Sequence, residues 1–173
     1  MNNKKIMQWY GNFCAAAILF VICGFCGWIY EIAVTSYLHG HFVNRGFLHI
    51  PVLPIYGVFS FIMLPVFRKH NSLPIVFFGG MAITTALELL SSYLIEWILG
   101  YGLWSYKTWD FNFDGRISLY SSLAFGIMSV ILIKGAYPLV RKMYEKFPKW
   151  VICVLGSIFT TTIIIDFIIS MGG

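Results

Sequence analysis

Residues 39–57, HGHFVNRGFLHIPVLPIYG, separate the first two long apolar runs of the chain. The segment carries Asn44, Arg45, three histidines and two prolines, interleaved with large apolar side chains. A plain connection between two membrane helices needs only a few polar turn residues. We therefore expect this stretch to fold back against protein or lipid and to form part of the working face of the molecule.

The composition on both sides of this stretch excludes a water-soluble domain. Of the 173 residues, 59% are hydrophobic and 11% are charged, whereas soluble proteins carry about 25% charged residues. The apolar runs are long enough to cross a bilayer as helices, which takes about 20 residues each. The sequence has no alternating segments of the outer-membrane barrel type. We expect an all-α, polytopic integral membrane bundle that forms one domain over residues 1–173.

The apolar runs predict about five transmembrane helices, over residues 11–37, 51–67, 74–99, 119–140 and 150–171. The second helix is barely long enough to span, and Pro51 and Pro54 suit its entry turn better than its interior. The two outer loops would be residues 38–50 and 100–118. The first apolar run lacks a small-residue cleavage site, so we expect it to stay as a membrane anchor.

The positions of the cations predict the orientation of the bundle. With five helices, eight lysines and arginines would lie on one side and three, Arg45, Lys107 and Arg116, on the other. The positive-inside rule then places the amino terminus in the cytoplasm and both polar loops outside. The net charge of +5 is mainly this orientation signal, so we expect no nucleic-acid partner.

Charged residues inside the apolar runs need an explanation, because each costs about 2.5–3.5 kcal/mol to insert near the centre of a membrane helix. Glu88, Ser92 and Glu96 are spaced four residues apart, which places them along one helix face. Glu31 and Asp166 lie near the outer ends of their helices. Two interpretations stay open. These carboxylates pair with Arg45 and Arg116 to lock the helices together, or the same pairs line a ligand pocket.

Two short patterns resemble metal or redox motifs. His39 and His41 form an H-x-H pattern that is able to chelate Zn²⁺ with a further ligand, and Cys23 and Cys26 form a C-x-x-C pattern. The cysteines fall within an apolar run, where small packing residues are the common case. We interpret the histidines as interfacial residues and expect no metal and no cofactor.

The chain carries several motifs in order: Gly27-Trp28-Ile29-Tyr30-Glu31, Asn44-Arg45-Gly46-Phe47-Leu48, Pro51-Val52-Leu53-Pro54-Ile55-Tyr56-Gly57, Glu88, Trp104-Ser105-Tyr106 and Phe111 through Leu119. Together they resemble those of the CmpB-type family of bacterial membrane proteins described as "putative ABC transporter permease". The resemblance covers about residues 16–140. Three positions, Ile50, Leu53 and Ser105, depart from the family pattern. At Ser105 the family has an aspartate, which is lost here unless Asp110 replaces it.

The resemblance and the polar residues together imply a small membrane transport component in the bacterial cytoplasmic membrane. We expect it to recognise a polar or zwitterionic solute, or a lipid headgroup, at the extracytoplasmic face. The candidate ligand-binding residues are Glu31, Asn44, Arg45, Tyr56, Glu88, Ser92, Asn112 and Arg116. The alternative is an integral membrane enzyme acting on a lipid or lipoprotein at the outer leaflet, with Glu31 or Glu88 as the general base.

The chain has no phosphate-binding loop of the G-x-x-x-x-G-K-[S/T] type, so active transport needs a separate ATPase subunit. The basic turn Arg141–Lys149 is the inner segment long enough to dock one. Inner turns this short argue against a conventional permease and suit a small substrate-binding membrane subunit, by analogy of size alone. The expected partners are therefore the lipid bilayer, an ATPase subunit and a second copy of the chain.

Overall fold

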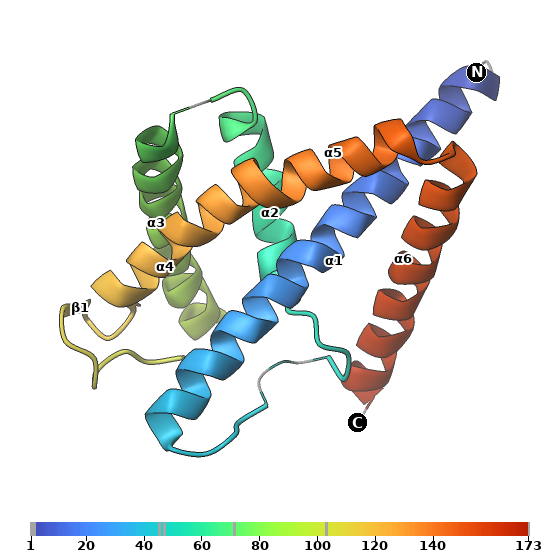
Figure 1. The fold of residues 1–173 in the computed structure, drawn as a ribbon. Coiled ribbons are helices and arrows are strands. Elements are labelled where there is room, and N and C mark those ends of the chain that lie inside the picture. The colour runs from blue at the N-terminus through green and yellow to red at the C-terminus, as the bar shows by residue number, and fades with distance from the viewer. Residues whose placement is uncertain (1–2, 45, 47, 71, 103, 173) are drawn as a thin grey trace. The chain divides into compact units, whose positions relative to one another are not determined.

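A computed structural model describes residues 3–44, 46, 48–70, 72–102 and 104–172 of this chain. Its helices are α1 (Asn3–His39), α2 (Pro54–Phe67), α3 (Leu73–Leu99), α4 (Leu119–Val130), α5 (Tyr137–Lys146) and α6 (Lys149–Gly172). A π-helical segment, η1 (Ile131–Ala136), joins α4 to α5, and the short strands β1 (Asn112–Phe113) and β2 (Ile117–Ser118) precede α4 (Figure 1).

Within the described residues, four helical stretches are long and apolar enough to cross a membrane. They are Lys5–Tyr37, Leu73–Leu99, Leu119–Lys146 and Lys149–Met171, and Pro54–Phe67 is a shorter apolar helix. The all-α membrane bundle expected from the sequence is confirmed. The orientation of the amino terminus stays a prediction.

Two helices are longer than the apolar runs that predicted them. α1 begins at Asn3, because a polar lead of good helix formers extends the helix without needing apolar contacts. The fourth run continues as helix to Lys146, so the expected basic turn at residues 141–149 is helical over most of its length. Pro138, near the start of α5, lacks the N–H that would bond to the carbonyl group of Lys134, and the preceding turn is π-helical.

The contacts of the chain divide it into two compact units. Unit 1 comprises residues 1–62 and 136–173, and unit 2 comprises residues 63–135. The single domain expected from the sequence stays a prediction.

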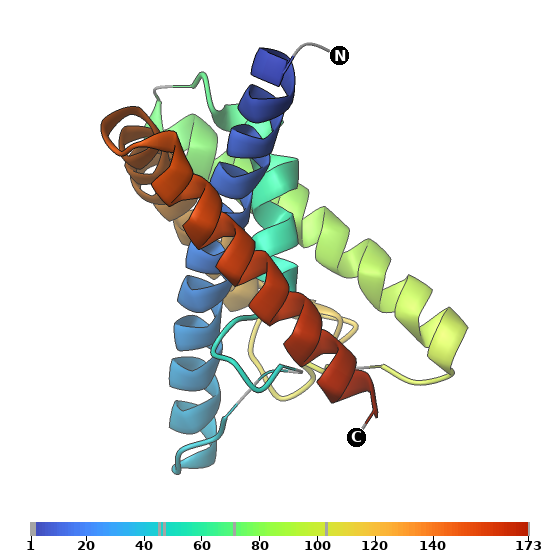
Figure 2. The same ribbon diagram turned by 90° about the vertical axis from the view of Figure 1, so that its right-hand side faces the viewer.

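In unit 1, α6 passes obliquely across α1 (Figure 2). The helices come close where Gly156, which lacks a side chain, faces the backbone of Cys14. The hydroxyl groups of Tyr10 and Ser157 are 2.6 Å apart beside this crossing. α5 joins the same unit through Tyr144, whose ring lies against Gly11.

The segment between α1 and α2 turns back along α1 instead of extending away from it. The Leu53 N–H donates to the carbonyl group of Gly24 over 3.1 Å, and Gly24 lies about 22 Å along α1 from His39, at 1.5 Å per residue. Gly27 has no Cβ, which makes room for the ring of Tyr56. α2 has 14 residues and is therefore about 21 Å long, against about 30 Å for a hydrocarbon core. We call residues 40–44, 46 and 48–53 the re-entrant segment.

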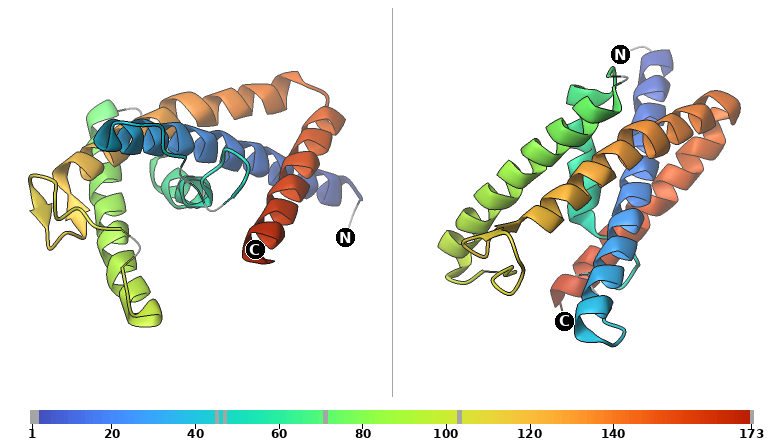
Figure 3. Two further views of the ribbon diagram at one scale, coloured as in Figure 1. Left: turned by 90° about the horizontal axis from the view of Figure 1, so that it is seen from below. Right: turned by 60° about the vertical axis from the view of Figure 1, so that its left-hand side comes forward.

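In unit 2, α3 packs against α4. Gly80 admits Ser129, and Gly126 admits the ring of Phe77. The chain between the two helices ends in a hairpin beside α3 at the start of α4 (Figure 3). Asp114 and Gly115 have φ values of 53° and 65°, and the Arg116 N–H donates to the Phe113 carbonyl group over 3.0 Å. This is the left-handed Asp-Gly turn that matches the twist of two antiparallel strands.

Candidate functional site

Glu88 on α3 is the centre of a polar cluster in unit 2. One carboxylate oxygen accepts a hydrogen bond from the hydroxyl group of Tyr106 at 2.8 Å, and the other accepts one from Ser121 at 3.3 Å. Ser121 belongs to the capping box at the first turn of α4. The exposed N–H groups of a helix start favour a nearby negative charge. Glu88 therefore joins α3, the chain before the hairpin and the start of α4.

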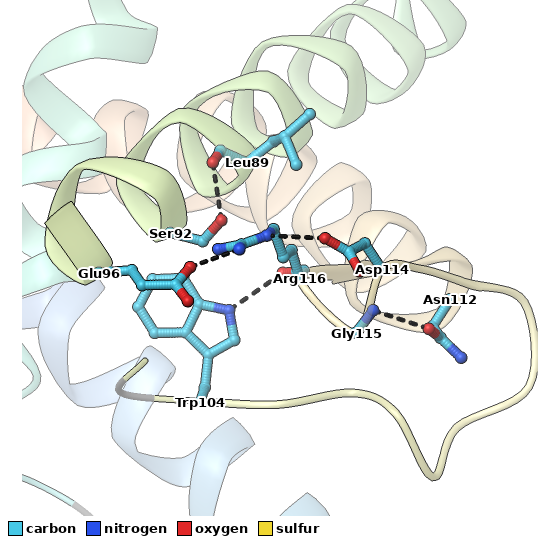
Figure 4. Close-up of polar contacts among 8 residues, drawn as sticks. All are labelled: Leu89, Ser92, Glu96, Trp104, Asn112, Asp114, Gly115 and Arg116. Atoms are coloured by element: carbon cyan, nitrogen blue, oxygen red, sulfur yellow. Dashed lines mark hydrogen bonds and ion pairs between the residues drawn. The ribbon is translucent and has the colours of Figure 1, made fainter. Parts of the chain in front are cut away.

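Arg116 forms a second cluster at the end of α3. Its guanidinium group pairs with Glu96 and donates to Asp114 over 3.1 Å (Figure 4). The same group lies 4.1 Å from the centre of the Tyr93 ring. The hydrogen bond with Glu96 raises the pKa of Arg116, burial opposes that effect, and the hydrogen bond with Asp114 adds to it. The side chains of Arg116, Glu96 and Asp114 are 20%, 47% and 60% exposed. The ion pairs are formed but are accessible.

The other two candidate residues of unit 2 mainly shape the site. The side chain of Asn112 donates to the Trp109 carbonyl group over 2.8 Å and accepts from the Gly115 N–H over 2.9 Å, so it fixes the hairpin turn. Ser92 is buried and donates to the Leu89 carbonyl group of its own helix (Figure 4). Trp104 also contacts the hairpin, because its ring N–H donates to the Arg116 carbonyl group over 3.0 Å.

Unit 1 holds the remaining candidates. The buried Tyr56 donates its hydroxyl hydrogen to Glu31 over 2.9 Å. Asn44 accepts a hydrogen bond from the ring N–H of Trp28 over 3.3 Å. Arg45 lies outside the described residues. The structure thus brings Glu31 and Tyr56 together in unit 1, and it places Glu88 and Arg116 near the same hairpin in unit 2.

Three polar contacts were missed in the sequence. Tyr106 and Ser121 hold Glu88, and His49 Nδ1 lies 3.0 Å from Asp166 Oδ1, across 117 positions of the chain. The Asp-Gly pair between Phe113 and Ile117 is a hairpin signal in the sequence, but it does not by itself place Tyr106 beside Glu88. No comparable sequence signal marks the pair of His49 and Asp166.

The described residues contain no group of three or more His, Cys, Asp or Glu side chains placed to hold a metal ion. The four cysteines are free thiols, and Cys23 and Cys26 lie within α1. The polar groups that the clusters described above offer are carboxylates, hydroxyl groups, the guanidinium of Arg116 and the imidazole of His49.

Membrane-length helices with charged clusters at their loops define a polytopic membrane protein. The chain belongs to the family described as Putative ABC-transporter type IV, whose model matches residues 18–171. The match confirms the family resemblance found in the motifs and extends it through α6. No curated protein and no solved structure matches the chain.

Proposed function

We propose that this chain is the membrane component of a transport system and recognises a polar or zwitterionic solute, or a lipid headgroup, at the extracytoplasmic face. Membership of an ABC-transporter-type family supports a role in transport. The observation that carries the proposal is the accessible ion-pair cluster of Arg116, Glu96 and Asp114. Exposed ion pairs contribute only about 0–1 kcal/mol to stability, and the carboxylate side chains here are about half exposed, so a ligand is able to displace them at little cost.

Each charged residue has a role in this proposal. Arg116 binds an anionic group of the ligand through its planar fork, in exchange for one of its present carboxylate partners. In unit 2, Glu88 meets a cationic group and Asn112 supplies neutral hydrogen bonds. In unit 1, Glu31 and Asn44 are proposed for the same two roles separately, on their places in the sequence motifs. Arg45 is proposed as a second anion-binding residue on its place in the sequence motif alone.

The energy for active transport comes from a separate ATPase subunit in this proposal, since the sequence has no phosphate-binding loop. Arg141, Lys142 and Lys146 are exposed on α5, while Val140 of the same helix is buried. This amphipathic helix and the turn that follows offer a cationic docking surface, which corresponds to the predicted Arg141–Lys149 segment.

The proposal is tested by uptake of a panel of labelled solutes in cells with and without the gene. We expect at least one zwitterionic or anionic solute to enter more slowly in the deletion strain and to recover with the wild-type chain. Equal uptake of every solute would count against transport. A changed lipid composition with unchanged uptake would favour the lipid-modifying enzyme instead, above all if Glu88→Gln failed to restore the lipids.

A further inference from the structure

The re-entrant segment is fastened to two helices of unit 1. On one side, the Leu53 N–H donates to the Gly24 carbonyl group of α1. On the other side, His49 and Ile50 both contact Asp166 of α6. In Figure 1 the segment runs from the end of α1 past the carboxyl-terminal end of α6 and on to α2. The direction in which the chain enters α2 therefore depends on both attachments.

Asp166 is arranged to hold the backbone of this segment. It is a buried carboxylate on a membrane-length helix, and its Oδ2 accepts the Ile50 N–H over 3.1 Å. Its Oδ1 lies 3.0 Å from His49 Nδ1, and the Ser170 hydroxyl group lies 3.1 Å from the same nitrogen. A charged group at such a position is costly unless it is paired, so the segment and the carboxylate stabilise each other.

The two partners differ sharply in their access to water. The side chain of His49 is 69% exposed, whereas that of Asp166 is 11% exposed. Nδ1 of His49 is occupied by Asp166 and Ser170, and the exposed part of the ring gives protons a route to the imidazole. Histidine is the side chain whose charge ordinarily changes between pH 5 and 8. A protonated ring has N–H groups on both nitrogens and forms a full ion pair with Asp166, whereas a neutral ring keeps one N–H and no charge.

We propose that His49 and Asp166 form a proton-binding site that controls how firmly the re-entrant segment is attached to α6. Protonation of His49 adds an ionic attraction to the hydrogen bond that Asp166 already makes with Ile50, and the segment is held more tightly. Deprotonation removes that attraction and loosens the segment. The proposal does not depend on which solute the protein recognises.

Glu31 and His41 are two further titratable residues beside or on the segment. Glu31 on α1 is engaged by Tyr56, and His41 lies on the segment itself. Asp166 is the carboxylate that the His49 ring contacts, and its second oxygen accepts the Ile50 N–H. Asp166 therefore links the charge of His49 to the backbone of the segment.

The test measures release of the segment as a function of pH in the full chain, reconstituted in lipid nanodiscs. Val52 is 5% exposed and lies against Gly24, so Val52→Cys in a variant without the native cysteines reacts slowly with a maleimide while the segment is attached. Phe42→Cys, at a position that is 72% exposed on the same segment, corrects for the effect of pH on the reagent. The measured quantity is the labelling rate at position 52 divided by the labelling rate at position 42. This ratio is determined at pH 6 and at pH 8.

We expect the ratio to rise about two- to fivefold from pH 6 to pH 8, the change that a partly exposed ion pair gives. His49→Gln and Asp166→Asn should give a high ratio at both pH values. His49→Lys, with a fixed positive charge, should keep the ratio low at both, and the control His70→Gln should behave like the wild type. If Val52→Cys perturbs the fold, the site is tested by melting temperatures instead. The wild type and the His49, Asp166 and His70 variants, with the native cysteines and Val52 intact, are then compared at pH 6 and pH 8. An unchanged pH response in His49→Gln, or no response in the wild type, would overturn the proposal.

Discussion

At the scale of single residues, Glu88 shows how a carboxylate can be kept on a membrane-length helix. The hydroxyl groups of Tyr106 and Ser121 reach its two oxygens, and Ser121 brings the positive end of α4 close to the charge. The four-residue spacing of Glu88, Ser92 and Glu96 was visible in the sequence. The partners were not, because Tyr106 and Ser121 lie 18 and 33 positions away and reach Glu88 only through the fold of the chain between α3 and α4.

Tyr106→Phe should destabilise the protein by about 1.5–3 kcal/mol, the usual contribution of a hydrogen bond to a charged acceptor. Tyr101→Phe is the matched control, because Tyr101 is 61% exposed. Unfolding of the two variants in detergent micelles provides the measurement. Equal stability of both variants would show that the hydrogen bond between Tyr106 and Glu88 contributes little.

Arg116→Lys should give a folded, membrane-inserted and inactive protein, because lysine keeps the charge but not the planar fork. The same outcome is expected for Arg45→Lys. Arg68→Lys is the control, since Arg68 is exposed directly after α2 and has no role in the proposed site. Uptake and the melting temperature in detergent are measured together. Full uptake in both lysine variants would refute arginine recognition, and loss of folded protein in both would assign these residues a structural role.

At the scale of elements, run length and apolar character were sufficient to predict the helices. Length alone did not show where a helix continues beyond the apolar run. α1 and α5 are extended by polar residues that are compatible with a helix in water or at a membrane surface. The sequence predicts a loop where the structure has a hairpin. The strands are only two residues long, which is too short to show an alternation of polar and apolar side chains.

The re-entrant segment was partly predicted. The polar and aromatic content of residues 39–57 indicated a stretch that folds back, and Pro54 does begin α2. Its attachment to α6 was not predicted. Asp166 is distant in sequence, and its charge alone does not indicate which residue it contacts. The structure also shows what approaches two glycines of α1: Val52 lies against Gly24, and the ring of Tyr56 lies against Gly27.

Gly27→Ala should destabilise unit 1, because a Cβ at this position would overlap the ring of Tyr56. Overpacking of this kind costs about 1–3 kcal/mol. Gly135→Ala is the control, since nothing lies within 4 Å of a Cβ there, and it should be neutral or slightly stabilising. Thermal unfolding in detergent compares the two. A Gly27→Ala variant as stable as Gly135→Ala would contradict the close packing of α2 on α1.

At the scale of the whole molecule, the family and the membrane-length helices agree on a polytopic membrane protein. The orientation comes from the cations alone: Lys4, Lys5, Arg68, Lys69 and the basic residues from 141 to 149 lie on the predicted inner side. Sequence reasoning was strong on the membrane class, because insertion depends on the length and apolar character of the helices, while the orientation stays a prediction. It was weak on the site, which depends on which loops fold onto which helices.

Single cysteines at Asn44 and Asp114, in a variant without the native four, should react with a membrane-impermeant thiol reagent in intact cells. A cysteine at Asn71 should not react until the cells are lysed. The expectation follows from the excess of cations on the predicted cytoplasmic side. Labelling at position 71 together with protection at 44 would invert the topology and place the proposed site in the cytoplasm.

The most direct test of ligand recognition is native mass spectrometry of the full chain released from lipid nanodiscs. The wild type and Arg141→Lys should both carry the same bound polar molecule or lipid, because neither alters the cluster around Arg116. Arg116→Lys and Glu88→Gln should lose it while staying folded. Identical mass profiles for all four proteins would contradict the account, since the accessible charges of unit 2 would then hold the fold together and recognise nothing.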